Sequence, residues 1–141
     1  MGEFLEATYD KFVFKVKDGC LYNRDDFWAR VEGGVATVGI TDFAQGELGD
    51  IVFVELPAVG AKVSMAKPFG TVEAVKAVSD LNAPLSGEVT AVNGDLQGSP
   101  DAVNKDAYGK GWMVKIKLSD PSEATKLMDA AGYEKMEKHG H

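Results

Sequence analysis

Short runs of β-branched and apolar residues, each bounded by turn residues, recur along the chain. In the clearest, from Trp112 to Leu118, every second residue is large and apolar, and two lysines stand between them. A similar run from Val35 to Ile40 follows the turn dipeptide Gly33-Gly34. Alternation with a period of two is typical of strands that bury one face. The pattern predicts a mainly β fold in which short strands close into a folded-over sandwich.

The other expected elements follow from the same local rules. We expect strands at 12–17, 28–31, 51–56, 72–75 and 89–92, and a helix over 43–48 between a cap at Thr41 or Asp42 and Gly49. Ser99-Pro100-Asp101 is expected to open a helical turn that runs through Val103. Asp120-Pro121-Ser122-Glu123 is typical of a helix start. The apolar stripe formed by Ala124, Leu127, Met128 and Ala131 predicts one helix there, ended by Gly132.

Length and charge limit the classes of function. The 141 residues fit a single domain, 1–141. A net charge of −7 argues against nucleic acid as a partner, because phosphate binding favours a basic surface. The single cysteine, Cys20, excludes an internal disulfide, and no metal-ligand spacing is present. We expect a cytoplasmic protein with no signal peptide and no membrane span.

Lys76 lies between two strand-like runs and is followed by turn residues, an arrangement that an ordinary surface lysine does not require. The run 72–75 precedes it, and a second run, 89–92, follows after Pro84 and Gly87. We therefore expect Lys76 at the tip of a hairpin between these two runs, with Pro84 at the start of the return strand. Such a placement is typical of a lysine that an enzyme modifies and that then moves between partners. The alternative is a solvated lysine between two strands.

Several segments, in this order, carry a family resemblance: VGITDFAQ (38–45), LGDIVFVELP (48–57), VEAVKAVSD (72–80), APLSGEV (83–89) and YGKGW (108–112). They resemble the H-protein group of the biotinyl/lipoyl-carrier family, over a core of about 22–133 with an N-terminal extension, 1–11, and a C-terminal tail, 134–141. The resemblance implies a barrel-sandwich hybrid with short peripheral and C-terminal helices, carrying lipoic acid on Lys76. Biotin carriers flank their lysine with methionines, so Val75 and Ala77 favour lipoate.

The neighbours of Lys76 form a candidate recognition segment for the lipoate-attaching enzyme: Glu73, Val75, Ala77 and Asp80. The two carboxylates have an equally plain alternative role, which is to keep an exposed hairpin soluble. Cys20 stands beside Gly19 without a nearby histidine and is expected to be an idle thiol.

Asp26-Phe27-Trp28 departs from the H-protein pattern, which usually has His-Glu-Trp at this place. The resemblance implies that these three residues belong to the surface on which the lipoyl arm rests. Near neutral pH the Asp26 carboxylate is anionic, whereas the imidazole of a histidine at this place would be mostly neutral. This departure, together with the segment 9–14, is similar to the lipoate-binding proteins of heterodisulfide-reductase-like sulfur oxidation.

The sequence thus predicts a carrier and not a catalyst, because no nucleophile–base pair or phosphate loop is recognisable. The favoured hypothesis is a lipoyl carrier that shuttles sulfur intermediates to a heterodisulfide-reductase-like complex. The alternative is the glycine cleavage H protein, which carries an aminomethyl group between a decarboxylase, an aminomethyltransferase and dihydrolipoyl dehydrogenase. A third hypothesis is an unmodified adaptor that kept the fold.

Overall fold

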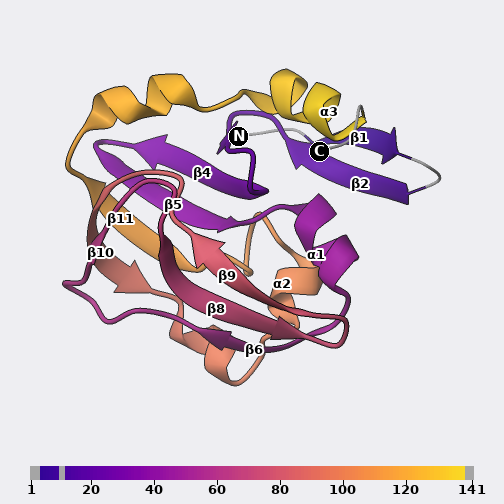
Figure 1. Ribbon diagram of the computed structural model, residues 1–141, viewed down its shortest axis with the longest axis horizontal. Helices are drawn as coiled ribbons and strands as arrows, with labels where there is room; N and C mark the ends of the chain where they lie inside the picture. Colours follow the sequence, from indigo (N-terminus) through magenta and orange to yellow (C-terminus); the bar gives the residue numbers. More distant parts are fainter. Residues whose placement is uncertain (1–3, 10–11, 139–141) are drawn as a thin grey trace.

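The computed structural model describes residues 4–9 and 12–138, and their side chains from Val16 to Met136. The tail histidines, His139 and His141, lie outside the described residues. Within these ranges the strands form three sheets, accompanied by short helices (Figure 1). The expected mainly β barrel-sandwich hybrid with short peripheral helices is confirmed. None of the described helices is long and apolar enough to cross a membrane.

The largest sheet has the strand order β3-β4-β5-β11-β10-β7, with antiparallel neighbours throughout. Its strands are β3 (Leu21–Tyr22), β4 (Phe27–Glu32), β5 (Val35–Ile40), β7 (Lys62–Val63), β10 (Gly87–Val92) and β11 (Val114–Leu118). The second sheet has the order β6-β8-β9, from β6 (Ile51–Glu55), β8 (Pro68–Ala74) and β9 (Val78–Asn82). A two-stranded sheet pairs β1 (Phe4–Tyr9) with β2 (Phe12–Lys17).

Short helices accompany these sheets. They are α1 (Asp42–Leu48), the 3₁₀ turn η1 (Gly94–Gln97), α2 (Ala102–Lys105), the 3₁₀ turn η2 (Pro121–Lys126) and α3 (Ala130–Lys138). The predicted caps of α1 are confirmed: the Thr41 hydroxyl accepts from the Ala44 N–H, and Gly49 ends the helix. In Figure 1, α3 lies at the same end of the molecule as β1 and β2, with which it makes contacts.

Part of the core lies between the two larger sheets. One buried cluster draws on Phe27 and Ile40 from the large sheet and on Val54, Val72 and Leu81 from the β6-β8-β9 sheet. In Figure 1 these last three strands lie below β4 and β5. The sandwich therefore closes over apolar side chains that come from both layers.

The alternation over 112–118 is confirmed for its central part. Val114 and Ile116 are fully buried, whereas Lys115 and Lys117 are exposed. The strand β11 starts at Val114, so the partly buried Trp112 lies before it.

The hairpin partner predicted for the Lys76 strand is wrong. β8 pairs with β9, with Glu73 opposite Val78, and the run 89–92 belongs to β10 in the other sheet. The sequence gives little signal for strand β9, because it is an edge strand whose first three residues are exposed and its apolar alternation is therefore weak. Pro84 consequently lies in the connection from β9 to β10 and not at the start of the return strand.

The single helix predicted after Asp120 is also wrong. Asp120 does cap a helical start, because its carboxylate accepts from the Ser122 N–H at 3.1 Å. However, η2 ends at Lys126, and Met128 and Tyr22 exchange two backbone hydrogen bonds of 2.8 Å, which divert the chain. A separate helix, α3, then contains Gly132 and extends into the segment expected to be a tail.

Candidate functional site

Lys76 lies at the tip of the β8–β9 hairpin. The tip consists of Val75, Lys76 and Ala77, all exposed, and the Ala74 N–H donates to the Ala77 carbonyl at 2.8 Å to close the turn. The prediction that Lys76 stands at a hairpin tip is therefore confirmed, although the second strand is β9.

The tip is held against the segment that joins α1 to β6. The Val75 N–H donates to the Asp50 carbonyl at 3.0 Å, and the Lys76 N–H donates to the Leu48 carbonyl at 3.3 Å. A Cβ on Gly49 would lie 3.4 Å from three carbons of the Lys76 side chain, so the aliphatic stem passes over this glycine. The lysine is thus exposed at its end but fixed at its base, as a carrier arm requires.

Asn104, from α2, fixes the segment that supports the tip. Its Nδ2 donates to the Gly49 carbonyl at 2.9 Å and to the Gln45 side chain at 2.8 Å. Its Oδ1 accepts from the Ile51 N–H at 2.8 Å. Sequence reasoning missed Asn104, because its partners lie 53 to 59 residues away and no local motif marks it.

A pocket of about 330 Å³ opens beside this tip. Leu48, whose carbonyl accepts from the Lys76 N–H, is one of its lining residues, and β9 supplies another wall directly after the tip. The full lining consists of Arg24, Asp25, Asp26, Phe27, Ile40, Ala44, Glu47, Leu48, Val72, Ser79, Asp80, Leu81 and Asn82. The pocket therefore lies within the immediate surroundings of the candidate attachment lysine.

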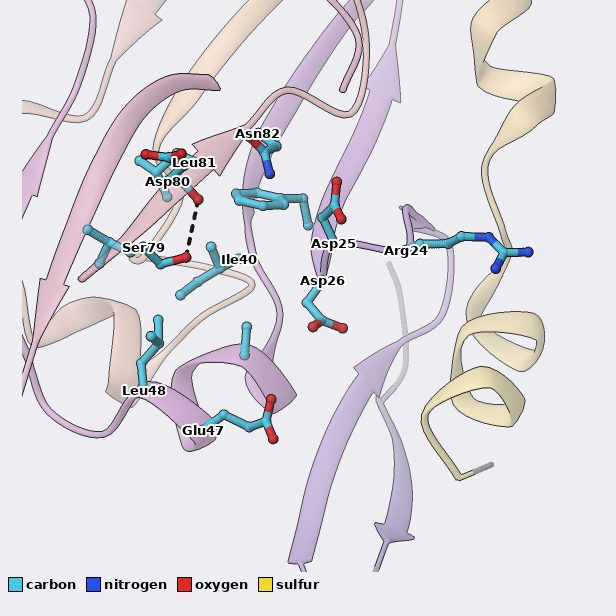
Figure 2. Close-up of a pocket in the computed structure, with 13 residues that line it drawn as sticks. Arg24, Asp25, Asp26, Ile40, Glu47, Leu48, Ser79, Asp80, Leu81 and Asn82 are labelled. Atoms are coloured by element: carbon cyan, nitrogen blue, oxygen red, sulfur yellow. Dashed lines mark hydrogen bonds between the residues drawn. The ribbon is translucent and has the colours of Figure 1, made fainter. Parts of the chain in front are cut away.

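The charges around this pocket are mostly negative. Its lining contains four carboxylates, from Asp25, Asp26, Glu47 and Asp80, and a single cationic side chain, from Arg24. Figure 2 shows the Arg24 side chain extending away from the other labelled side chains, whereas the carboxylates of Asp26 and Glu47 project from neighbouring walls. The pocket thus combines an apolar wall with an anionic one.

Asp26 is held in an uncommon backbone conformation. It is 8% exposed and has a φ of 69°, which a residue other than glycine rarely adopts but aspartate tolerates. Its backbone carbonyl accepts from the Thr41 N–H at 2.9 Å, and its Oδ1 accepts from the Tyr133 hydroxyl at 2.8 Å. Contacts from two distant segments therefore fix this carboxylate at the pocket wall.

Of the three residues predicted to form an arm-resting surface, Asp26 and Phe27 line the pocket, but Trp28 does not. Trp28 is fully buried, and its Nε1 donates to the Ala107 carbonyl at 3.0 Å. Side chains alternate along a strand, so Phe27 and Trp28 point to opposite faces of β4. Trp28 therefore cannot offer a resting surface, and it supports the sheet from the other side.

The predicted recognition residues Glu73, Val75, Ala77 and Asp80 are all exposed around the tip. They do not form one set, because Asp80 lines the pocket whereas the other three are not part of its lining. Their recognition by an attaching enzyme stays a prediction.

Cys20 lies in the core, with 2% of its surface exposed, and burial raises the pKa of its thiol. Both features oppose exchange with a disulfide arm. Among the described residues, no group of three or more His, Cys, Asp or Glu side chains is placed to hold a metal ion.

Comparisons with known proteins agree with this geometry. The glycine cleavage H-protein family model matches residues 20–140. The chain is 51% identical over 128 residues to the mitochondrial glycine cleavage system H protein of Oryza sativa subsp. indica, covering 91% of this chain and 78% of that one. It is 55% identical over 117 residues to the glycine cleavage system H protein of Brevibacillus brevis, covering 83% and 93%.

A solved structure shows the same fold. The crystal structure of a glycine cleavage system H protein from Mycobacterium marinum superposes with a TM-score of 0.76 at 37% identity, covering 82% of this chain and 94% of that one. The family match spans the pocket and the Lys76 hairpin together. The chain therefore belongs to the glycine cleavage H-protein family.

Proposed function

We propose that this chain carries lipoate as an amide on Lys76 and serves glycine cleavage as its H protein. In this role it is a carrier whose partners are a lipoate-attaching enzyme, a glycine decarboxylase, an aminomethyltransferase and dihydrolipoyl dehydrogenase. The relatives described above are named for the same system, which supports the proposal.

The surroundings of Lys76 fit a lipoyl group. The amine is exposed for acylation, and its stem already follows the surface over Gly49. Amide formation would remove the positive charge of Lys76. When bound, lipoate supplies a dithiolane that accepts and releases cargo by thiol chemistry. The protein supplies a fixed origin for the arm and, next to it, a pocket of about 330 Å³.

The acidic lining of that pocket is the observation that carries the choice of pathway. Glycine cleavage loads the arm with a primary amine, which is cationic near neutral pH. Four carboxylates around a partly apolar cavity stabilise such a cargo by Coulomb attraction. A persulfide or an oxidised sulfur cargo is anionic near neutral pH, and the same carboxylates would repel it.

The sulfur-oxidation hypothesis thus loses its main support. That hypothesis rests mainly on Asp26 and Phe27, which replace the histidine and glutamate usual at these places. In the structure, Asp26 contributes negative charge to the pocket and Phe27 contributes an apolar wall. Both properties suit a short apolar arm that ends in a cation, so the replacement is compatible with glycine cleavage. The comparisons offer no support for a sulfur pathway, and they support the alternative.

The test is an exchange assay with the lipoylated chain, glycine, labelled bicarbonate and a glycine decarboxylase, run beside an authentic H protein. We expect comparable rates of label incorporation for the two carriers. Background exchange with this chain, while the authentic H protein works with the same decarboxylase, would refute the proposal. Exchange by a Lys76→Arg variant would refute the assignment of the attachment site.

A further inference from the structure

The carboxylate of Asp26 is oriented by a tyrosine from the opposite end of the chain. Tyr133, in α3, is fully buried, and its hydroxyl donates to Asp26 Oδ1 at 2.8 Å across 107 residues of sequence. Its ring stacks on Tyr22, with 4.6 Å between the ring centroids and 17° between their planes. Burial and this stacking therefore hold the phenol ring in place beside the carboxylate.

The hydrogen bonds around this phenol run in one direction. The Tyr133 hydroxyl has one proton, and it goes to Asp26, so the bond of 2.7 Å between Thr41 Oγ1 and Tyr133 is donated by the threonine. The Ala44 N–H, in the first turn of α1, donates in turn to Thr41 Oγ1 at 3.2 Å. Bonds aligned in this way polarise one another, and this chain ends on a carboxylate oxygen, where donors bind most strongly.

We propose that Tyr133 is a positioning residue that fixes the Asp26 carboxylate at the pocket wall, so that it pairs with the cationic end of the loaded arm. The inference rests on the proposed function and names what, in this chain, holds the cargo. Tyr133 is not part of the pocket lining, so it acts through Asp26. Without the phenol proton, Asp26 would keep its backbone hydrogen bond to Thr41 but lose a bond that holds its side chain.

Tyr133→Phe tests this role with little change in packing, because the ring and its stacking on Tyr22 are kept. Tyr22→Phe is the matched control: Tyr22 is also fully buried in the same cluster, but its hydroxyl donates to the Lys17 carbonyl and it does not line the acidic pocket. Both variants delete one buried phenol hydroxyl, and only Tyr133→Phe removes the bond to Asp26.

The first measurement uses the unmodified full chain and NMR couplings that report the side-chain rotamer of Asp26. We expect one rotamer in the wild type and in Tyr22→Phe, and averaging between rotamers in Tyr133→Phe. A single fixed rotamer in Tyr133→Phe would overturn the positioning role.

The second measurement follows, by intact mass, how long the lipoylated chain retains its amine cargo in buffer without partner enzymes. Loss of a hydrogen bond to a charged group should shorten retention roughly tenfold in Tyr133→Phe. Asp26→Asn should shorten it as well, and the double variant should be no worse than Asp26→Asn alone, because both changes disable the same carboxylate. Unchanged retention in Tyr133→Phe, or losses that add independently in the double variant, would overturn the inference.

A third measurement needs no substitution, so it decides the matter even if Tyr133→Phe fails to fold. The hydroxyl proton of Tyr133 is followed by NMR in the wild type. We expect its exchange with solvent to slow when the cargo is loaded, and not on lipoylation alone. No change on loading would overturn the inference. If the inference about Tyr133 fails while the wild type supports normal glycine exchange, the proposed function remains intact. If the wild type supports only background exchange, the proposed function itself is refuted.

Discussion

The support that Asn104 gives to the Lys76 tip can be measured by removing its side chain. In Asn104→Ala, the Ile51 N–H loses its acceptor, and Ile51 is only 3% exposed. The Gly49 carbonyl and the Gln45 side chain are half-buried, so water can replace Asn104 there. One buried donor left unpaired and two bonds exchanged for water should lower the free energy of unfolding by about 2–4 kcal/mol.

The same substitution should slow lipoylation. The tip is bonded to the backbone carbonyls of Leu48 and Asp50, and Asn104 fixes the peptide between them through Gly49. We therefore expect a several-fold fall in kcat/KM for a lipoate ligase acting on Asn104→Ala under conditions where the variant is folded. Lys105→Ala is the matched control, because its ammonium is exposed and forms a surface ion pair with Asp101 at 2.9 Å.

Asn104→Asp separates the two contributions. Its carboxylate can still accept from the Ile51 N–H, but it cannot donate to the Gly49 carbonyl. We expect it to recover part of the lost stability and little of the lost ligation rate. If Asn104→Ala were less stable but ligated at the wild-type rate, the tip would not depend on this asparagine, and the reasoning would be refuted.

The remaining predictions concern the attachment site, the core and the thiol. Lys76→Arg should stay folded and show no lipoyl adduct by intact mass after co-expression with a ligase; a persistent adduct would contradict the site. Ile116→Ala should lower the free energy of unfolding by about 2–5 kcal/mol, because Ile116 is fully buried, while exposed Lys115→Ala stays near wild type in the same denaturant titration. Burial raises the pKa of the Cys20 thiol above its ordinary value of 9.0, so as the pH rises this thiol ionises in the unfolded chain before it ionises in the folded one. The contribution of the thiol to stability is therefore complete below pH 9.0 and falls at higher pH. Cys20→Ala should therefore lose less stability than the wild type between pH 9.0 and the raised pKa. If the free energies of unfolding of the two proteins fall in parallel with pH, this prediction is contradicted.

Local signals in the sequence predicted the elements that local interactions stabilise. The β4–β5 hairpin follows from Gly33 and Gly34, both with positive φ, and α1 from its caps at Thr41 and Gly49. The sequence does not predict β9, because the first three residues of this edge strand are exposed and its apolar alternation is weak. The break between η2 and α3 depends on backbone pairing of Met128 with the distant Tyr22, which helical periodicity cannot reveal.

The candidate site was predictable only in part, for a related reason. Lys76 could be found because its neighbours in sequence are also its neighbours in the hairpin. Asn104 and Tyr133 act through hydrogen bonds to residues 53 to 107 positions away, and an isolated asparagine or tyrosine in a helix leaves no pattern. The sequence marks Asp26 as a departure from the H-protein pattern, but the role of its side chain depends on burial and on the phenol that orients it.

Tyr133 and Asn104 contact the site at opposite ends of the short helix α1. At the N-terminus of α1, Thr41 caps the helix and bonds both to Tyr133 and to the backbone of Asp26. Just beyond its C-terminus, Gly49 supports the stem of Lys76 and is bonded to Asn104. Seven helical residues span about 10 Å at 1.5 Å each. A helix of fixed length therefore sets the distance between the base of the arm and the carboxylate proposed to hold its cargo. We therefore expect a change that distorts α1 to impair attachment and retention together, whereas changes at Asn104 or Tyr133 should separate them.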